Sequence, residues 1–199
     1  MRKLMVLNNL TLDGVMQAPG RPDEDTRGGF EHGGWAGPYN DEVKGRTMGE
    51  GMAGPHDLLF GRRTYEDFYS VWPKRTNNPF TPVLNSARKY VASRTLKAPL
   101  PWDNSTLLEG DAADAVARLK REPGNDLLVM GSGVLIESLR RHNLVDEYML
   151  LIHPLVLGNG RCMFPHDGTF AKLTLVKSVP TTTGVIIATY RPAASVAQS

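Results

Sequence analysis

Residues 126–143, DLLVMGSGVLIESLRRHN, predict a strand, a glycine turn and a helix in direct succession. The apolar residues 127–130 suit a buried strand, and the glycines at 131 and 133 allow a tight turn into the helix that follows. Residues 57–73, DLLFGRRTYEDFYSVWP, repeat this order with one glycine at the turn. Two strand–glycine–helix units in one chain indicate helices that cross between neighbouring strands of a mainly parallel sheet.

Shorter strands and one further helix surround these two units. Residues 2–8, RKLMVLN, predict an N-terminal strand that ends near Asn8. Residues 89–95 and 106–108 predict two more strands. Residues 111–121, DAADAVARLKR, predict an amphipathic helix, because an acid stands at the start and basic residues at the end. We expect these strands to join one sheet.

The C-terminal third of the chain is richer in β-forming residues. The run from Glu147 to Leu157 predicts a strand interrupted by Pro154, and a proline inside a strand indicates an edge position or a bulge. Residues 171–192 predict two strands joined around residues 180–184, which is an antiparallel hairpin. The sequence therefore predicts an α/β fold with a mostly parallel central sheet, flanking helices and an antiparallel C-terminal hairpin.

A long segment rich in glycine and proline separates the first strand from the 57–73 unit. It runs from Gly14 to Gly54 with at most one helix, around residues 40–49, and such a long irregular segment is usually functional or mobile. A chain of 199 residues suits one domain, which we place over residues 1–192. Residues 193–199 are small and polar, so we expect a flexible tail.

Composition argues against several classes of protein. The formal charge is only +2 and the basic residues are dispersed, so no nucleic-acid partner is expected. The one cysteine, Cys162, cannot form an internal disulfide or a zinc site, and the five histidines match no metal motif, so we expect no metal. No apolar run suits a membrane span or a signal peptide, and we expect a cytoplasmic protein with no membrane partner.

The two glycine turns are candidates for a phosphate-binding site. Glycine lets the backbone approach a phosphate closely, and the free N–H groups and positive end of the following helix attract the negative charge. Residues 61–64, GRRT, and residues 131–133, GSG, both stand at such a turn. A tight strand–helix connection also needs glycine without any ligand. Together the two turns resemble a dinucleotide site, although neither completes a Walker loop or the GxGxxG pattern.

Arginine side chains follow two of the predicted strands. Arg62 lies beside the first glycine turn, and Arg94 follows Ser93 at the end of the strand that starts at residue 89. If both strand ends face one crevice, two guanidinium groups and a hydroxyl suit the 2′-phosphate of NADPH. The alternative is a solvated loop arginine, which is the interpretation we adopt for Arg63.

Six short motifs occur in an order that matches a known family. They are LTLDGV at 10–15, LLFGRRTY at 58–65, VASR at 91–94, VMGSG at 129–133, LVDE at 144–147 and HPLVLGNG at 153–160. This set resembles the dihydrofolate reductase superfamily, and most closely the branch typified by the reductase domain of riboflavin biosynthesis. The resemblance spans roughly residues 3–191. It implies the three-layer fold of that superfamily, with an eight-stranded, mostly parallel sheet and NADPH across the strand ends.

The resemblance also implies which residues bind the cofactor. They come from the two glycine turns, from the end of the strand that starts at residue 89, and from the loop after the first strand. The residues are Gly61, Arg62 and Thr64 for the phosphates, Ser93 and Arg94 for the adenosine ribose, Gly131, Ser132, Gly133, Val134 and Leu135 for the pyrophosphate, and Leu12, Asp13, Gly14 and Val15 for the nicotinamide.

A true dihydrofolate reductase holds its pteridine through one buried carboxylate on the first helix. The corresponding stretch here is residues 34–42, GWAGPYNDE, in which Asp41 is the first candidate and Glu42 the second. Either acid is also suited to a helix start without a ligand. Burial would raise the pKa of the acid, so that water held beside it could supply the proton of the reaction. Trp35 either packs near the substrate ring or anchors the loop to the core.

Two other polar features are assigned structural roles. Asp146 and Glu147 are neighbours, and adjacent strand residues point to opposite faces of a sheet, so the two acids cannot flank one substrate atom. His142 and His153 match no motif, and we expect ordinary core or surface histidines.

The combined expectation is an NADPH-dependent reductase that transfers hydride to a small heterocyclic substrate with a pteridine- or pyrimidine-like ring. The alternative is a non-catalytic NADPH- or drug-binding protein of the same fold, because no residue is an unmistakable proton donor. A flavin-dependent reductase has less support, since no motif signals flavin. Members of this branch are often homodimers, and the β-rich C-terminal third suits a self-complementary surface, so we expect a homodimer.

Overall fold

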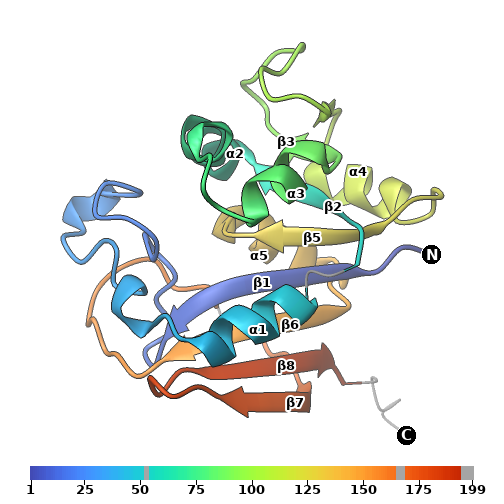
Figure 1. Ribbon diagram of the computed structural model, residues 1–199. Helices are drawn as coiled ribbons and strands as arrows, with labels where there is room; N and C mark the ends of the chain where they lie inside the picture. Colours follow the sequence, from blue (N-terminus) through green and yellow to red (C-terminus); the bar gives the residue numbers. More distant parts are fainter. Residues whose placement is uncertain (52–53, 165–168, 194–199) are drawn as a thin grey trace, which may run out of the picture.

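A computed structural model describes residues 1–51, 54–164 and 169–193, and it contains one mixed sheet with helices on both faces (Figure 1). The strands are β1 (Leu4–Thr11), β2 (His56–Gly61), β3 (Lys89–Ala92), β4 (Ser105–Leu108), β5 (Asp126–Met130), β6 (Glu147–His153), β7 (Leu173–Pro180) and β8 (Ile186–Pro192). The α-helices are α1 (Glu42–Gly51), α2 (Arg62–Val71), α3 (Phe80–Ser86), α4 (Ala112–Leu119) and α5 (Gly133–Arg141). Short 3₁₀ turns span Arg27–Gly29, Gly37–Tyr39 and Trp72–Lys74.

The eight strands lie in the order β4-β3-β2-β5-β1-β6-β8-β7. Neighbours from β4 to β6 are parallel, whereas β8 pairs antiparallel with both β6 and β7. The fold class predicted from the sequence is therefore confirmed, including the antiparallel C-terminal hairpin.

Two apolar cores lie on the two faces of the sheet. Strand residues alternate between them, because successive side chains point to opposite faces. Leu4 and Val6 of β1 join the core that α4 and α5 cover, whereas Leu7 joins the core that contains side chains of α1, α2 and α3. Figure 1 shows α1 to α3 on the near side of the sheet and α4 and α5 behind it. The result is the predicted three-layer arrangement.

One buried and one partly exposed ion pair close the edge of the sheet where the parallel strands begin. Arg2, just before β1, pairs with Asp57 of β2, and both side chains are almost inaccessible to solvent. Lys120, which follows α4, pairs with Asp146, whose carboxylate also accepts from the backbone N–H of Leu4. Because these groups are bonded to one another, this edge is a structural one.

Two predictions about the strands need correction. β1 continues to Thr11, beyond the expected end near Asn8, because it pairs with β6 as far as His153. Pro154 occupies neither an edge strand nor a bulge: β6 lies between β1 and β8 and ends one residue earlier. Proline has no N–H for the next ladder position, so it follows the strand instead of interrupting it.

Helix α3 was not predicted from the sequence. Its segment, NPFTPVL from Asn78 to Leu84, contains two prolines, which normally argue against a helix. Both prolines lie at the helix start, where no intrahelical N–H bond is lost. The Asn78 side chain accepts a hydrogen bond from the backbone N–H of Phe80 at 2.9 Å and so supports this start.

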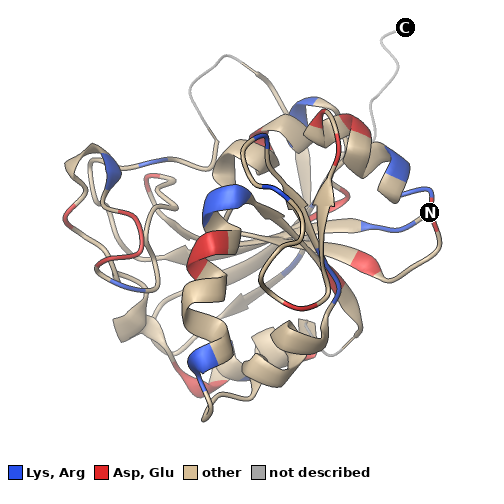
Figure 2. Cartoon of the chain, turned by 90° about the horizontal axis from the view of Figure 1, so that it is seen from above, with Lys and Arg blue, Asp and Glu red and all other residues tan. Residues whose placement is uncertain are grey.

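Charge is mixed over the described part of the chain. Figure 2 shows basic and acidic segments interspersed on neighbouring elements. None of the helices among the described residues is both long and apolar enough to cross a bilayer. Most of the expected tail, residues 194–199, lies outside the described residues.

Candidate functional site

The carboxyl ends of the parallel strands form the second edge of the sheet. β1, β2, β5 and β6 end here at Thr11, Gly61, Met130 and His153 respectively. In open α/β sheets, ligands bind in crevices outside these carboxyl ends. Most of the sequence-predicted site residues follow directly on these strands.

The two predicted glycine turns are bonded to each other. The hydroxyl oxygen of Ser132 accepts a hydrogen bond from the backbone N–H of Gly61 at 3.0 Å. In return, the backbone N–H of Ser132 donates to the hydroxyl of Thr64, also at 3.0 Å. The backbone N–H of Gly131 donates to the Asn8 side chain at 2.8 Å, which adds β1 to the arrangement. We call the Ser132 bonds to Gly61 and Thr64 the serine latch.

Backbone conformation explains the glycine at residue 131. Gly131 and Ser132 both have positive φ, at 61° and 58°. A Cβ on Gly131 would also lie 3.1 Å from the Thr64 methyl group. The chain thus turns sharply from β5 into α5, whose first N–H groups have no intrahelical acceptor. Free N–H groups at a helix start suit an anion such as a phosphate.

Gly133 meets a neighbour that the sequence did not indicate. A Cβ at this position would lie 2.9 Å from the sulfur of Met16, so the glycine lets the loop after β1 pack against the start of α5. Beyond it, Val134 is 80 % exposed, whereas Leu135 is buried in the core. Of the predicted residues on this helix, Val134 presents its side chain to solvent and Leu135 does not.

The predicted arginines, Arg62 and Arg94, follow the ends of the neighbouring strands β2 and β3. The register of β2 and β3 pairs Gly61 with Ala92, so Arg62 and the residues after Ala92 follow side by side. Arg62 pairs with Glu66 at 3.1 Å across one turn of α2, and Arg94 is exposed. The Ser93 hydroxyl accepts from the backbone N–H groups of Thr95 and Leu96, which stabilises the turn.

The loop after β1 is fixed to the segment after β6. The carboxylate of Asp13 accepts from the backbone N–H groups of Leu157 and Gly158, and the Thr11 hydroxyl lowers the pKa of this carboxyl. Gly14 has a φ of 80°, and Val15 is buried and bridges to Cys162. Asp13 and Val15 therefore make structural contacts. Leu12 differs from them, because its side chain is 65 % exposed at the strand end.

Trp35 makes the contacts of a loop anchor. Its indole N–H donates to the carbonyl oxygen of Gln17 at 2.7 Å, and the ring is buried. The ring also stands edge-on to the imidazole of His153, with 5.1 Å between the centroids. Of the two roles considered for Trp35, these contacts favour attachment of the loop to the core.

Asp41 differs from the sequence-based expectation. One oxygen caps α1 by accepting from the backbone N–H of Lys44 at 2.7 Å, and the other accepts from the hydroxyl and N–H of Thr182 and the N–H of Thr183. The bonds from Thr182 and Lys44 lower the pKa of Asp41 to about 2. The expected rise of this pKa is wrong, because hydrogen bonds to the charged form outweigh burial. Glu42 is exposed at the start of the same helix.

Two buried polar side chains near this helix were missed as site candidates. His153, at the end of β6, is completely buried and its Nε2 lies 3.0 Å from the Asn9 side-chain oxygen. Lys44 of α1 is 9 % exposed. No local sequence pattern links them, since they are far apart in the chain and come near enough to interact electrostatically only in the folded structure.

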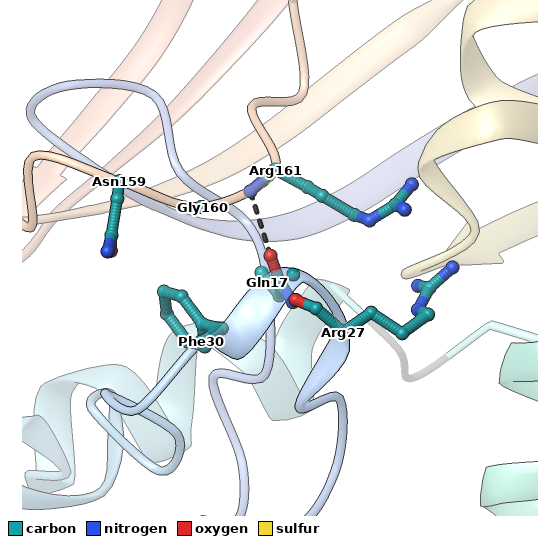
Figure 3. A pocket seen from close by; sticks show the side chains of 7 residues that line it. Gln17, Arg27, Phe30, Asn159, Gly160 and Arg161 are labelled. Carbon is teal, nitrogen blue, oxygen red and sulfur yellow. Dashed lines mark hydrogen bonds between the residues drawn. The ribbon is translucent and has the colours of Figure 1, made fainter.

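A separate hollow of about 280 Å³ lies where the loop after β1 meets the segment after β6 (Figure 3). Gln17 joins its walls: its side chain accepts from the backbone N–H of Arg161 and donates to the carbonyl oxygens of Asp25 and Arg27. Arg27 is held by an ion pair with Asp25. None of the predicted site residues lines this hollow, whose other lining residues are Gly28, Phe30, Asn159 and Gly160.

Comparison with known proteins places these features in context. The family model of the RibD C-terminal domain matches residues 2–187. The Bacillus subtilis (strain 168) protein YyaP, described as uncharacterized, is 31% identical over 138 residues, which is 67% of this chain and 72% of YyaP. YwjB of the same organism, also described as uncharacterized, is 29% identical over 73 residues, covering 37% of this chain and 42% of YwjB.

Two crystal structures share the fold. A putative riboflavin biosynthesis protein from Shewanella sp. PV-4 superposes with a TM-score of 0.70 at 23% identity, covering 97% of this chain and 99% of the other. A pyrimidine reductase-like protein from Corynebacterium diphtheriae superposes with a TM-score of 0.61 at 13% identity. The match covers 96% of this chain and 92% of the other.

The Asp41 carboxylate predicts a specific pH dependence of stability. Its pKa falls from an ordinary 3.8 to about 2, so its stabilising effect is complete above about pH 5 and is lost as the pH falls through 3.8 toward 2. We expect Asp41→Asn to lower the Tm at pH 7, and the difference from wild type to shrink over that acid range. Circular dichroism melts between pH 2 and pH 7 measure both quantities.

Glu42→Gln is the matched control for this measurement. It removes the same charge from an exposed position one residue later, so its Tm should stay close to that of the wild type. The assignment of the capping bonds is contradicted if Asp41→Asn has the same Tm as the wild type at neutral pH, or if a lower Tm of this variant does not approach that of the wild type in acid.

Proposed function

Because the chain belongs to the RibD C-terminal domain family, we propose that it is a reductase that uses NADPH to reduce a small heterocyclic substrate with a pteridine- or pyrimidine-like ring. The observation that carries the proposal is the serine latch, which joins the glycine turns of β2 and β5 at the carboxyl edge of the sheet. The description of the Corynebacterium neighbour as pyrimidine reductase-like supports the choice of ring. We propose one domain over residues 1–192 for this activity.

The residues around the latch fit a dinucleotide. The start of α5 offers N–H groups without intrahelical acceptors, in a turn that brings two strand ends together. We assign the pyrophosphate to the turn of Gly131 and Ser132, where the N–H groups of the first residues of α5 would bind it, since the N–H groups of Gly131 and Ser132 are bonded to Asn8 and Thr64. The exposed side chain of Leu12 supplies an apolar surface at the end of β1 for the nicotinamide ring.

In this proposal the chain contributes mainly positioning. The bound cofactor would supply the hydride, and the protein orients the ring and keeps water away from it. Asp41 is ionised at neutral pH and its oxygens are occupied, so it is a poor proton donor. We therefore take the proton from water near the start of α1, where Glu42 is exposed.

The second candidate function is that of an NADPH- or drug-binding protein without catalysis. The contacts of Asp41 favour it, because the acid expected to assist protonation serves instead to cap a helix and hold a hairpin. The two candidates share the cofactor site and differ only in turnover.

Turnover of NADPH separates these two functions. We expect loss of NADPH absorbance with at least one member of a panel of pyrimidine and pteridine compounds, and a reduced product that mass spectrometry identifies. NADPH binding without oxidation across the whole panel would favour the binding protein, and failure of NADPH to bind would remove both candidates.

Arg62 and Arg94 should set a preference for NADPH over NADH. A hydrogen bond to a charged group contributes roughly 1.5 to 3 kcal/mol, which corresponds to about 10- to 150-fold in affinity. We expect Arg62→Ala and Arg94→Ala to weaken NADPH binding by a factor in this range with little change for NADH, which lacks the 2′-phosphate. Dissociation constants for both cofactors measure the effect, and added salt should weaken NADPH binding more.

Arg63→Ala is the matched control, since Arg63 is an exposed neighbour on the same helix. It should change neither constant appreciably. Equal losses of NADPH and NADH in the Arg62 and Arg94 variants would mean that these arginines hold the shared pyrophosphate or the fold.

We also propose a cytoplasmic homodimer that forms through the C-terminal hairpin. β7 is the edge strand of the sheet, and Leu175 and Val176 on it expose about half of their surfaces. Exposed apolar side chains on an unpaired edge strand suit pairing with a second copy. The proposal needs no metal and no nucleic acid.

Light scattering checks the homodimer. The wild type should have twice the mass of the chain at micromolar concentration, and Val176→Lys should shift it to a monomer because a charge on the edge opposes pairing. Val83→Lys, which changes a similarly exposed residue on α3, is the control and should leave the mass unchanged. A monomeric wild type excludes the homodimer.

A further inference from the structure

His153 presents an unused hydrogen-bond acceptor inside the protein. Its Nε2 lies 3.0 Å from the side-chain oxygen of Asn9, and because an amide oxygen only accepts, Nε2 must carry the proton. Nδ1 is then a bare lone pair. This nitrogen is buried and has no hydrogen-bond partner among the described residues. Buried polar atoms are normally paired, so an unpaired one at the carboxyl edge of the sheet needs an explanation.

Lys44 is a second polar group close enough to affect His153 electrostatically. It lies on α1 with 9 % of its surface exposed, and its ammonium makes no hydrogen bond or ion pair with the described part of the chain, although solvent reaches the nitrogen. Asp41, three residues earlier, uses its oxygens for the helix cap and the hairpin, and Glu42 is exposed. Burial therefore lowers the pKa of Lys44, and the charge of Asp41 only partly opposes this. A cation with little exposure and no anionic partner is a suitable contact for an acceptor on a ligand.

The two side chains affect each other electrostatically. Burial first, and then the positive charge of Lys44, lower the pKa of His153 to about 4. The imidazole is therefore neutral at pH 7 and keeps its acceptor. The rings of Trp35 and Tyr39 stand edge-on to it, with centroids at 5.1 and 5.4 Å, and form aromatic walls beside the polar pair.

We propose that Lys44 and His153 form the substrate-recognition pair of this chain and bind a lactam edge. The ammonium of Lys44 donates to the carbonyl oxygen of the ring, and the adjacent ring N–H donates to Nδ1 of His153. The flexible stem of Lys44 moves aside to admit the flat edge. This selects a ring that presents an acceptor next to a donor, whereas a carboxylate on the same helix would select an amidine-like edge. The inference rests on the proposed function only for the statement that the bound ring is reduced; the binding of the ring does not depend on it.

Binding of two small probes tests this recognition. 2-Pyridone carries the lactam edge, and N-methyl-2-pyridone has the same carbonyl without the N–H. We expect 2-pyridone to bind the wild type more tightly than N-methyl-2-pyridone, and Lys44→Met to weaken 2-pyridone by about 10-fold or more. NMR titrations of the full chain, with and without NADPH, give the affinities.

The controls separate recognition from a structural role. Lys74→Met removes an exposed lysine and should leave 2-pyridone affinity unchanged. The Tm of Lys44→Met should match or exceed that of the wild type, because a charge on a mostly buried side chain is removed. NADPH affinity should be the same in both variants. The titration without NADPH measures binding of the probe whether or not the chain is a reductase. Failure of the recognition proposal can therefore be distinguished from failure of the proposed function.

A pH series provides a second signature. Affinity for 2-pyridone should fall as the pH drops toward 4, where Nδ1 of His153 takes up a proton, and again at alkaline pH, where Lys44 loses its proton below its usual range. Asp41 stays ionised throughout and does not contribute. Equal affinity of the two probes, an unchanged affinity in Lys44→Met, or no binding of 2-pyridone to the wild type overturns the proposal.

Discussion

The hydrogen bonds of Ser132 are the constraint on which the carboxyl edge of the sheet depends. One side chain and one backbone N–H connect the turn after β5 to both Gly61 and Thr64, so two strand–helix units share a single rigid junction. The left-handed conformation of Ser132 is unfavourable for a residue with a side chain, and such conformations persist where the surroundings fix them. This geometry leaves the first N–H groups of α5 open at the edge of the sheet.

The two edges of the sheet differ in how their polar groups are satisfied. At the amino edge, Arg2 and Asp57 are paired although both are buried. One guanidinium nitrogen of Arg2, Nη1, has no hydrogen-bond partner in the described part of the chain, but the rest of the group is held by Asp57 and by the carbonyl oxygen of Asn125. At the carboxyl edge, the buried Nδ1 of His153 has no partner among the described residues. A folded chain tolerates unsatisfied buried groups only at a cost, and sites where local rules are broken are often functional ones. The unpaired Nδ1 lies at the edge where ligands bind in open α/β sheets, and this is the physical basis for looking for a ligand there.

Local sequence patterns predicted much of the fold and less of the site. The strand–glycine–helix order of residues 57–73 and 126–143 was sufficient for the parallel sheet, because each unit is encoded within a short stretch. The role of Asp41 could not be predicted, since its partners Thr182 and Thr183 lie about 140 residues further along the chain. The local pattern identified an acid at a helix start. Only the fold decides whether a second element reaches that acid.

The bonds of Asp13 and Gln17 have a consequence for how this chain can diversify. Both residues lie in the loop after β1 and bind backbone groups of the segment after β6, at residues 157–161. The partner atoms are backbone N–H groups, so they remain available when the side chains of the segment change. Their positions, however, depend on the length of that segment. If only one of the two segments were exchanged for that of a relative, the carboxylate of Asp13 and the side-chain oxygen of Gln17 would lose their N–H donors. The two segments should therefore change together among relatives. Transfer of a substrate specificity from one relative to another should require that both segments are exchanged.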